Sequence, residues 1–94
     1  MAKVIVQHHV SDYDAWFRVF SDHADTRRRY GATSHTVSRS VTDPNTVLVV
    51  NDFATTAGAQ AFSADPTLKE AMARAGVDGA PQVWITEDSE VFAY

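Results

Sequence analysis

The chain contains no cysteine. Disulfide bonds, thiolate metal sites and a cysteine nucleophile are therefore excluded. Glycine and proline are also scarce, with four and three residues respectively. The sequence has neither a glycine-rich phosphate loop nor the Gly-x-Ser-x-Gly elbow of acyl hydrolases, so nucleotide-dependent and serine-hydrolase mechanisms have no support.

Positive charge is in deficit, because eight Lys and Arg against twelve Asp and Glu give a formal net charge of −4. This sign repels phosphate backbones and anionic lipid headgroups, so we expect neither nucleic acid nor a membrane as a partner. No apolar run reaches the length that crosses a bilayer. The N-terminal segment turns polar too soon for a signal peptide, and a cytoplasmic location is the expectation.

The 94 residues suffice for one domain and are too few for two independent cores, so residues 1–94 are predicted to form a single domain. Hydrophobic periodicity, turn residues and caps divide it into short, closely spaced elements. The predicted elements are a strand over 3–10, a helix from Ser11 or Asp12 to Gly31, strands over 33–41 and 46–53, a helix from Thr55 or Thr56 that breaks at Asp65-Pro66 and ends at Gly76, and a strand over 82–87.

The first helix carries a largely aromatic stripe at helical spacing, formed by Tyr13, Trp16, Phe17, Phe20, Ala24 and Arg27. The run 27–29 consists of three arginines and falls in the predicted last turn, where cations suit the helix dipole. We interpret this run as a solvated helix end.

The order strand–helix–strand–strand–helix–strand predicts an α+β, ferredoxin-like βαββαβ fold, in which both helical segments cover one face of a four-stranded antiparallel sheet. The other face would meet water. Yet three strands carry apolar residues on both sides: Val4 and Val6 against Ile5, Val47 and Val49 against Leu48 and Val50, and Val83 and Ile85 against Trp84. A second copy is the simplest cover, so a homodimer is predicted, with the apolar tail 91–94 packing on the partner subunit.

Several short pieces of the sequence together resemble small dimeric α+β barrel proteins, relatives of the antibiotic-biosynthesis monooxygenases that include "cyclase"-type bacterial members. The pieces are the histidine-bearing first strand, Asp12-Tyr13-Asp14-Ala15-Trp16, Phe20 with His23, Arg27 with Gly31, Asp43-Pro44-Asn45-Thr46-Val47, and the segment 68–77 before Pro81.

This resemblance implies a dimeric α+β barrel with a pocket in each subunit between sheet and helices. Cofactor-independent oxygenation of electron-rich aromatic polyketides, cyclisation and haem degradation all occur in the family. Trp16, Asn51 and Arg39 are residue types that the cofactor-free oxygenases use to hold a substrate anion. The haem-degrading branch has an Asn on the first strand and a His on a helix. Here His8 and His9 occupy the first strand and the second helical region has no histidine, so no haem or other cofactor is expected.

Histidines are the most informative polar residues. If Val4 and Val6 face the helices, His8 does too, and His35 shares a face with Arg39 on the second predicted strand. His23 follows Phe20 by three residues. We therefore predict His8, His23 and His35 as acid–base candidates, with Arg39 as the holder of an anion or enolate. Each histidine taken alone is more often structural.

The predicted substrate contacts are aromatic and polar side chains near these histidines, namely Tyr13, Trp16, Phe20, Asn51 and Asp52. An aromatic stripe is more often core packing, and Asp52 is equally well read as a strand-end cap. His8 and His9 are strand neighbours that point to opposite faces, and no His-x-x-x-His pair exists, so no metal site is predicted.

Three functions remain open. The first is a small cofactor-independent enzyme, of monooxygenase or cyclase type, acting on an aromatic or polyketide-like molecule between sheet and helices. The second is a non-catalytic ligand-binding or regulatory module of the same fold. The third, RNA recognition on the sheet, is disfavoured by the net charge. A closed, dry core around Phe20 with no cavity beside His35 would argue against the enzyme, whereas a pocket of about 300 Å³ or more lined by at least two histidines would favour it.

Overall fold

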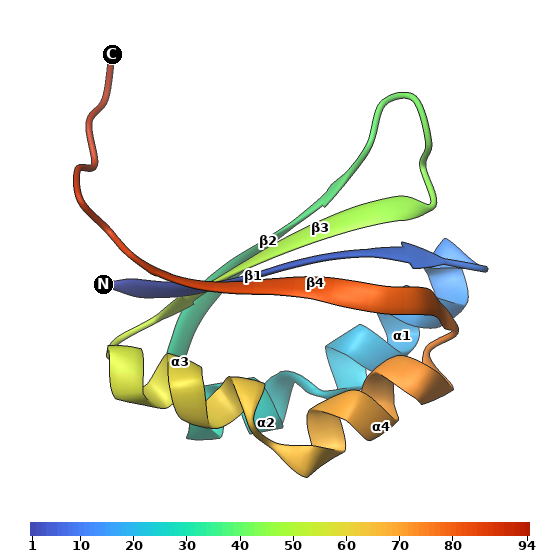
Figure 1. The fold of residues 1–94 in the computed structure, drawn as a ribbon, viewed down its shortest axis with the longest axis horizontal. Coiled ribbons are helices and arrows are strands. Elements are labelled where there is room, and N and C mark those ends of the chain that lie inside the picture. Colours follow the sequence, from blue (N-terminus) through green and yellow to red (C-terminus); the bar gives the residue numbers. More distant parts are fainter.

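The computed structural model describes all of residues 1–94 as four strands and four helices (Figure 1). In chain order these are β1 (Ala2–Val10), α1 (Tyr13–Asp22), α2 (Ala24–Arg29), β2 (Ala32–Arg39), β3 (Thr46–Phe53), α3 (Thr56–Ser63), α4 (Pro66–Arg74) and β4 (Val77–Glu87). None of the helices combines the length and apolar character needed to cross a membrane.

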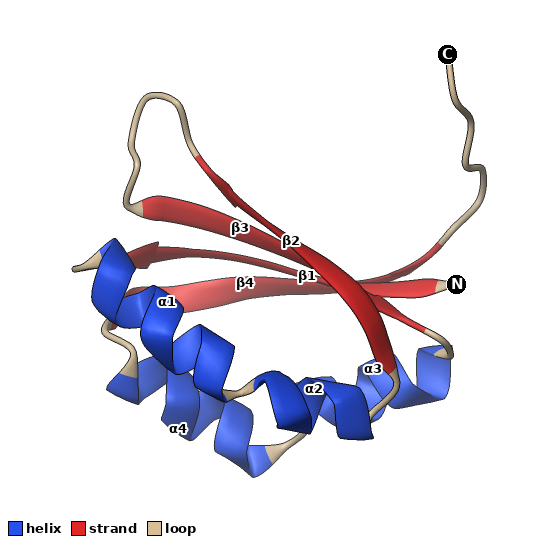
Figure 2. Ribbon diagram, turned by 180° about the vertical axis from the view of Figure 1, so that it is seen from behind, coloured by secondary structure: helices blue, strands red, loops and turns tan.

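The strands form one antiparallel sheet in the order β2-β3-β1-β4. All four helices lie on the same face of this sheet, which leaves the other face without a covering layer (Figures 1 and 2). The predicted α+β, ferredoxin-like βαββαβ architecture is confirmed, and the second helical segment breaks at Asp65-Pro66 as predicted, whereas the first is also divided into two helices.

The division of the first helix corrects the sequence prediction of a single helix. His23 leaves helical geometry, with φ −89° and ψ 7°, and ends α1 while preceding α2. Its backbone N–H is shared between the carbonyls of Val19 and Phe20, and Arg27 Nη1 also donates to the Phe20 carbonyl at 2.9 Å. A side-chain donor thus helps to satisfy a carbonyl at the end of α1, where intrahelical partners run out.

The other helix boundaries follow the predicted caps. The Asp12 carboxylate accepts from the Ala15 N–H at 3.2 Å, and the Thr55 hydroxyl accepts from the Gly58 N–H at 3.0 Å. Asp65 accepts from the Thr67 N–H at 2.7 Å, and Pro66 starts α4. Caps of this kind satisfy N–H groups that the first helical turn leaves unpaired.

The last strand begins five residues earlier than predicted, at Val77 instead of Gln82. The segment Gly79-Ala80-Pro81 was expected to connect helix and strand. Because β4 is an edge strand, Pro81 can lie in it without removing a hydrogen bond from the interior of the sheet. The pairing with β1 shifts register between Gln7 and His9, and this irregularity accommodates the segment.

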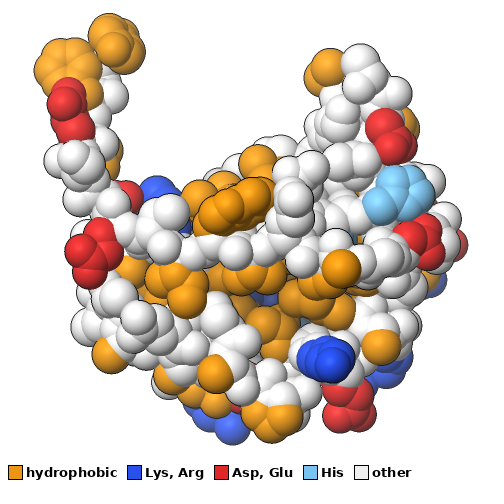
Figure 3. Space-filling view, in the orientation of Figure 1, with side chains coloured by type: hydrophobic (Ala, Val, Ile, Leu, Met, Phe, Trp, Pro, Cys, Tyr) orange, Lys and Arg blue, Asp and Glu red, His pale blue; other side chains and the backbone are white.

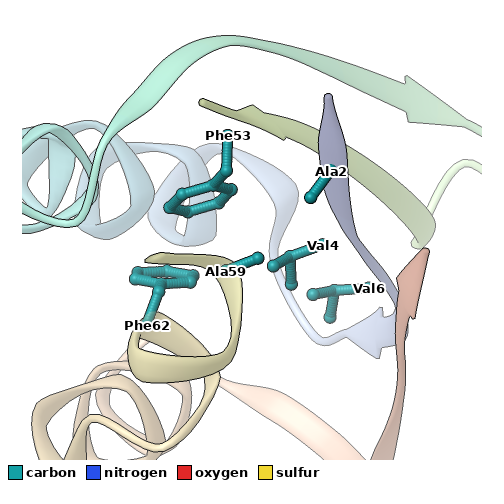
Figure 4. Packing of buried hydrophobic residues seen from close by; sticks show 6 residues of the cluster. All are labelled: Ala2, Val4, Val6, Phe53, Ala59 and Phe62. Carbon is teal, nitrogen blue, oxygen red and sulfur yellow. The ribbon is translucent and has the colours of Figure 1, made fainter. Parts of the chain in front are cut away.

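The protein core contains two clusters on the helix-covered side of the sheet. One is wholly apolar and includes Val4, Phe53, Ala59 and Phe62, with the two phenylalanine rings 5.4 Å apart (Figure 4). The other, which includes Val10, Trp16, Val47, Val49 and Ala75, lies under α1 and the end of α4. The candidate site lies beside the second cluster.

The uncovered face of the sheet is apolar at its centre. Ile5 pairs with Val50 on one side and with Trp84 on the other, and Leu48 lies beside them on β3. Leu48 and Trp84 are 37% and 44% exposed. The tail after β4 stands away from the rest of the molecule and carries hydrophobic side chains at its end (Figures 1 and 3). Phe92 and Tyr94 in this tail are exposed.

Candidate functional site

A cavity of about 50 Å³ lies between the sheet and helices α1, α2, α3 and α4. Ten of its fourteen lining residues are hydrophobic, so four polar side chains define its chemistry. These four are His8, His23, Arg27 and Asn51. The volume suits a few small molecules of the size of water, and it is well below the volume of about 300 Å³ that an aromatic ligand needs.

His8 lies on β1 with its side chain on the same face as Val4 and Val6, as strand alternation predicts. The side chain is buried, and neither ring nitrogen has a hydrogen-bond partner. Its ring lies 5.4 Å from that of Trp16. Burial lowers the pKa of His8 below 6.5, because the charged form is poorly solvated here. The group is therefore a neutral imidazole at pH 7 with unused hydrogen-bonding capacity.

Asn51 lies on the neighbouring strand β3, paired with Val4. Its Nδ2 donates to the Val4 carbonyl at 3.3 Å, which fixes the orientation of the amide. The Oδ1 atom is buried and has no partner. An unpaired buried acceptor costs about 1–3 kcal/mol, so a donor supplied by a ligand would be favourable at this atom.

Arg27 corrects the interpretation of residues 27–29 as a solvated helix end. Arg28 and Arg29 are exposed, whereas Arg27 is only 4% exposed and points inward. Its guanidinium lies 3.8 Å from the centre of the Phe20 ring. Arg27 takes part in none of the ion pairs of the molecule.

This isolation makes Arg27 the electrostatic centre of the site. Burial, reinforced by the charge of Arg28, lowers the pKa of Arg27 to about 10. The side chain nevertheless remains protonated at pH 7. A buried cation without a counterion favours the arrival of an anion, which would restore the lost electrostatic stabilisation.

His23 lies at the break between α1 and α2 and borders the cavity. Its Nε2 is 3.3 Å from the Thr67 hydroxyl on α4. Burial, followed by the positive charge of Arg27, lowers the pKa of His23, while Asp65 opposes that shift. His23 is thus a second neutral imidazole in the cavity wall at pH 7.

Trp16 and Phe20 form an aromatic wall, with ring centres 5.0 Å apart in a stacked arrangement. Both line the cavity. Phe20 also separates the cavity from His35, whose ring contacts it edge-on at 5.0 Å.

Four predicted site residues lie outside the cavity lining. His35 pairs with Asn51 and shares its face, but it borders a surface cleft at the sheet edge. Arg39 stacks over the Tyr13 ring at 3.8 Å and donates to the Pro44 carbonyl, so these two side chains pack against each other. Asp52 lies on the uncovered face, paired with Lys3 and Ser34.

Sequence reasoning assigned Arg39 the part of anion holder and missed Arg27. The signal was present, because Arg27 follows Phe20 by seven residues and so continues the aromatic stripe. His8, His23, Trp16, Phe20 and Asn51 are the predicted residues that the structure brings together around one cavity.

The sequence matches no protein-family model, and no curated protein resembles it by sequence. Its three-dimensional structure, in contrast, is similar to solved structures over nearly its full length. SnoaB, a cofactor-independent oxygenase from Streptomyces nogalater, superimposes with a TM-score of 0.79 at 13% identity, covering 99% of this chain and 97% of SnoaB. The fold is that of the antibiotic biosynthesis monooxygenases.

Two further structures support this assignment of the fold. One, an antibiotic biosynthesis monooxygenase, gives a TM-score of 0.71 at 14% identity over 96% of this chain and 100% of its own. The other, a conserved protein from Methanosarcina mazei Go1, gives 0.74 at 10% identity over 94% and 92%. At such identities the likeness concerns the fold, and the chemistry has to be argued from the residues of this chain.

Proposed function

We propose that the chain is a small cofactor-independent enzyme of monooxygenase or cyclase type that binds an acidic aromatic or polyketide-like molecule as its anion. The observation that carries this proposal is the buried Arg27 guanidinium, which lines the cavity and has no acidic partner. The same cavity is lined by two histidines that are neutral at pH 7. A base and an anion holder in one apolar cavity are the two groups that enolate or phenolate chemistry requires.

In the proposed reaction a neutral imidazole, His8 or His23, accepts a proton from an acidic C–H or O–H of the substrate. The electron pair stays on the substrate, whose anion is stabilised by Arg27 and by the aromatic wall of Trp16 and Phe20. In the oxygenase form this anion reduces dioxygen, so that a ring CH₂ and O₂ become C=O and water. In the cyclase form the same anion attacks a carbonyl carbon of its own chain and O₂ is not consumed.

Binding of an aromatic ring requires the cavity to expand. The lining includes Phe20, Leu68 and Met72, which are only partly buried and can change rotamer at moderate cost. Methionine in particular adapts to irregular volumes. Entry of a substrate would therefore displace side chains of α1 and α4, while the strands and their polar groups remain in place.

A binding measurement tests the anion site. Trp16 lines the cavity, so a Trp84→Phe background leaves its fluorescence as the sole tryptophan signal. We expect 1-naphthol to quench this signal, and Arg27→Met to weaken the binding on the order of tenfold, the effect of one charge-assisted hydrogen bond. Arg28→Met, which removes an exposed arginine paired with Asp25, is the matched control. Equal affinities in the two variants would refute the anion site.

Oxygen uptake distinguishes the possible activities. Anthrone, an aromatic ketone with an acidic ring CH₂, is the probe, and an oxygen electrode records its consumption of O₂ with and without protein. Catalysed uptake that Arg27→Met removes supports the oxygenase form. Binding without turnover of anthrone or of a linear polyketide would instead favour the alternative, a non-catalytic ligand-binding or regulatory module.

We further propose that the functional unit is a homodimer formed by the uncovered faces of two sheets. Ile5, Leu48, Val50 and Trp84 form a contiguous apolar patch on that face, and apolar side chains are exposed around β4 and at the tip of the tail (Figure 3). A contiguous exposed patch of this kind is typical of an interface. The tail carrying Phe92 and Tyr94 is free to cross to the partner.

Sedimentation equilibrium tests the dimer. The wild-type chain is expected to sediment as a dimer at micromolar concentration, and Trp84→Glu as a monomer, because it places a charge in the centre of the patch. Gln60→Glu, which adds the same charge at an exposed position of α3, is expected to remain dimeric. A monomeric wild-type protein would overturn this part of the proposal.

A further inference from the structure

His23 lies between two compartments of the molecule. It is one of the residues that line the internal cavity, and it also borders a polar surface cleft of about 250 Å³ between α2 and α4. No other residue belongs to both linings. Its position at the break between α1 and α2 explains this placement, since the ring is carried by the one residue that leaves helical geometry there.

The hydrogen bonds in the cleft determine which nitrogen of His23 carries the proton. The Thr67 hydroxyl donates to Asp65 Oδ1 at 2.5 Å, and a hydroxyl has only one proton to donate. The same oxygen lies 3.3 Å from His23 Nε2, so it must accept there. Nε2 therefore carries hydrogen, and in the neutral ring Nδ1 is left as the basic atom.

Asp65 is well suited to hold this arrangement. Its carboxylate also accepts from the Tyr30 hydroxyl and from the Thr67 N–H. Hydrogen bonds from Thr67 and Tyr30 lower the pKa of Asp65 to about 2, so it is an acceptor at any pH of interest. The other charged groups that act on His23 are Arg27 and Arg29 of α2 and Arg74 of α4, all of which disfavour a second proton on the ring.

We propose that Thr67 and Asp65 are positioning residues that hold His23 as the Nε2–H tautomer and present Nδ1 to the cavity as its acid–base atom. The ring forms part of the cavity wall while Nε2 is turned to the cleft, so Nδ1 is the nitrogen left for a ligand. The inference rests on the proposed function for its catalytic meaning. The proton moves from substrate to Nδ1, the substrate keeps the electron pair, and the Nε2–H bond stays intact.

Nitrogen-15 NMR of the imidazole rings in the full-length chain tests the tautomer without any substrate. Above the pKa of His23, the wild-type spectrum should show Nε2 as the protonated nitrogen and Nδ1 as the unprotonated one. Thr67→Val removes the acceptor and should give a mixture of tautomers, and Thr67→Ser should restore the single form. A wild-type ring protonated on Nδ1, or an unchanged spectrum in Thr67→Val, would overturn the proposal.

Two control variants distinguish the His23–Thr67–Asp65 hydrogen bonds from general effects of mutation. Thr26→Val removes a hydroxyl from the same cleft that does not contact His23, and the His23 signals should not change. Asp65→Asn keeps an oxygen acceptor for Thr67 but removes the charge, so the tautomer should persist while the pKa of His23 falls. A pKa of His23 that rises in Asp65→Asn would contradict the assigned role of the carboxylate.

Turnover of anthrone, where it is catalysed, separates this inference from the proposed function. Thr67→Val should lower kcat in proportion to the fraction of rings that NMR shows in the other tautomer, about twofold for an even mixture, with KM little changed, and Thr67→Ser should recover it. An unchanged kcat overturns the positioning role even if the tautomer is as expected. Absence of binding and turnover in the wild type defeats the proposed function, whereas the NMR result stands by itself.

Discussion

The two ends of the layer between sheet and helices differ in what they bury. Near α3, Val4, Phe53, Ala59 and Phe62 pack into a cluster with no polar member. Near α1, the corresponding space contains His8 and Asn51, where both His8 ring nitrogens and Asn51 Oδ1 lack a hydrogen-bond partner. It also contains Arg27, which donates to the Phe20 carbonyl but has no acidic partner for its charge. The first region is dominated by apolar packing, and its one buried side-chain polar atom without a partner is Ser63 Oγ at the end of α3.

The contrast between the two regions shows where buried polar groups lower the stability of the fold. Unsatisfied buried polar atoms and unpaired charges each cost about 1 kcal/mol or more, so a small domain retains few of them without a functional reason. Three of the four buried side-chain atoms without a partner belong to His8 and Asn51, which line one cavity together with Arg27, whereas the fourth, Ser63 Oγ, lies outside that lining. A ligand with an acidic group and a donor would complete them together, which is why this end is the candidate site and the α3 end is not.

The largest expected effect is at the apolar end. Phe53 is fully buried, and Phe53→Ala should lower the free energy of unfolding by about 3–5 kcal/mol, because it removes a large side chain and leaves a cavity. Phe20→Ala, at the polar end, should cost clearly less, because Phe20 is only partly buried and already borders a void. Urea denaturation measures both. An equal loss of unfolding free energy in Phe20→Ala and Phe53→Ala would contradict the proposed difference between the two regions.

The second expected effect has the opposite sign. Arg27→Met keeps most of the side-chain volume and removes a buried charge whose pKa is lowered to about 10. Removal of a buried, unpaired charge outweighs the loss of the hydrogen bond to the Phe20 carbonyl and of the cation–π contact with the Phe20 ring, so the free energy of unfolding should rise by about 1–2 kcal/mol. Arg28→Met is the control and should change stability little. A destabilised Arg27→Met would mean that the charge is compensated in the folded state.

Most of the fold could be predicted from the sequence, because the signals were local. Strand β3 has the predicted bounds, since alternation and the turn before it leave little freedom. The break at His23 could not be predicted, because the aromatic stripe continues through it at helical spacing. The start of β4 was wrong because Pro81 is tolerated only where a strand is at the edge of the sheet, and the order of strands is a tertiary property.

The site was less accessible to sequence reasoning. The alternation of side chains along a strand placed His8 and His35 on the same face of the sheet as the helices. Alternation predicts the face of the sheet, but it does not predict how far a residue lies from the cavity. His35 therefore proved to lie at the edge strand, and Arg39 against Tyr13. Helical spacing from Phe20 distinguishes Arg27 from Arg28 and Arg29 in the sequence, but spacing alone does not show that its charge lacks a partner. Its contact with Phe20 and the absence of a nearby carboxylate both depend on the packed structure.

The smallest effect at neutral pH is the pH dependence of the free energy of unfolding. It tests whether the site near α1 holds His8 as a neutral imidazole. Burial lowers the pKa of His8 below 6.5, its value in the unfolded chain. Between the two pKa values the unfolded chain binds more protons, so the free energy of unfolding is highest above pH 6.5 and falls as the pH drops towards the folded-state pKa. One group contributes a slope of at most about 1.4 kcal/mol per pH unit. His8→Phe should reduce the fall in the free energy of unfolding below pH 6.5. His9→Gln, on the opposite face of the same strand, is the control. If both variants reduce this fall equally, His8 is not held as the neutral imidazole that the proposed chemistry needs.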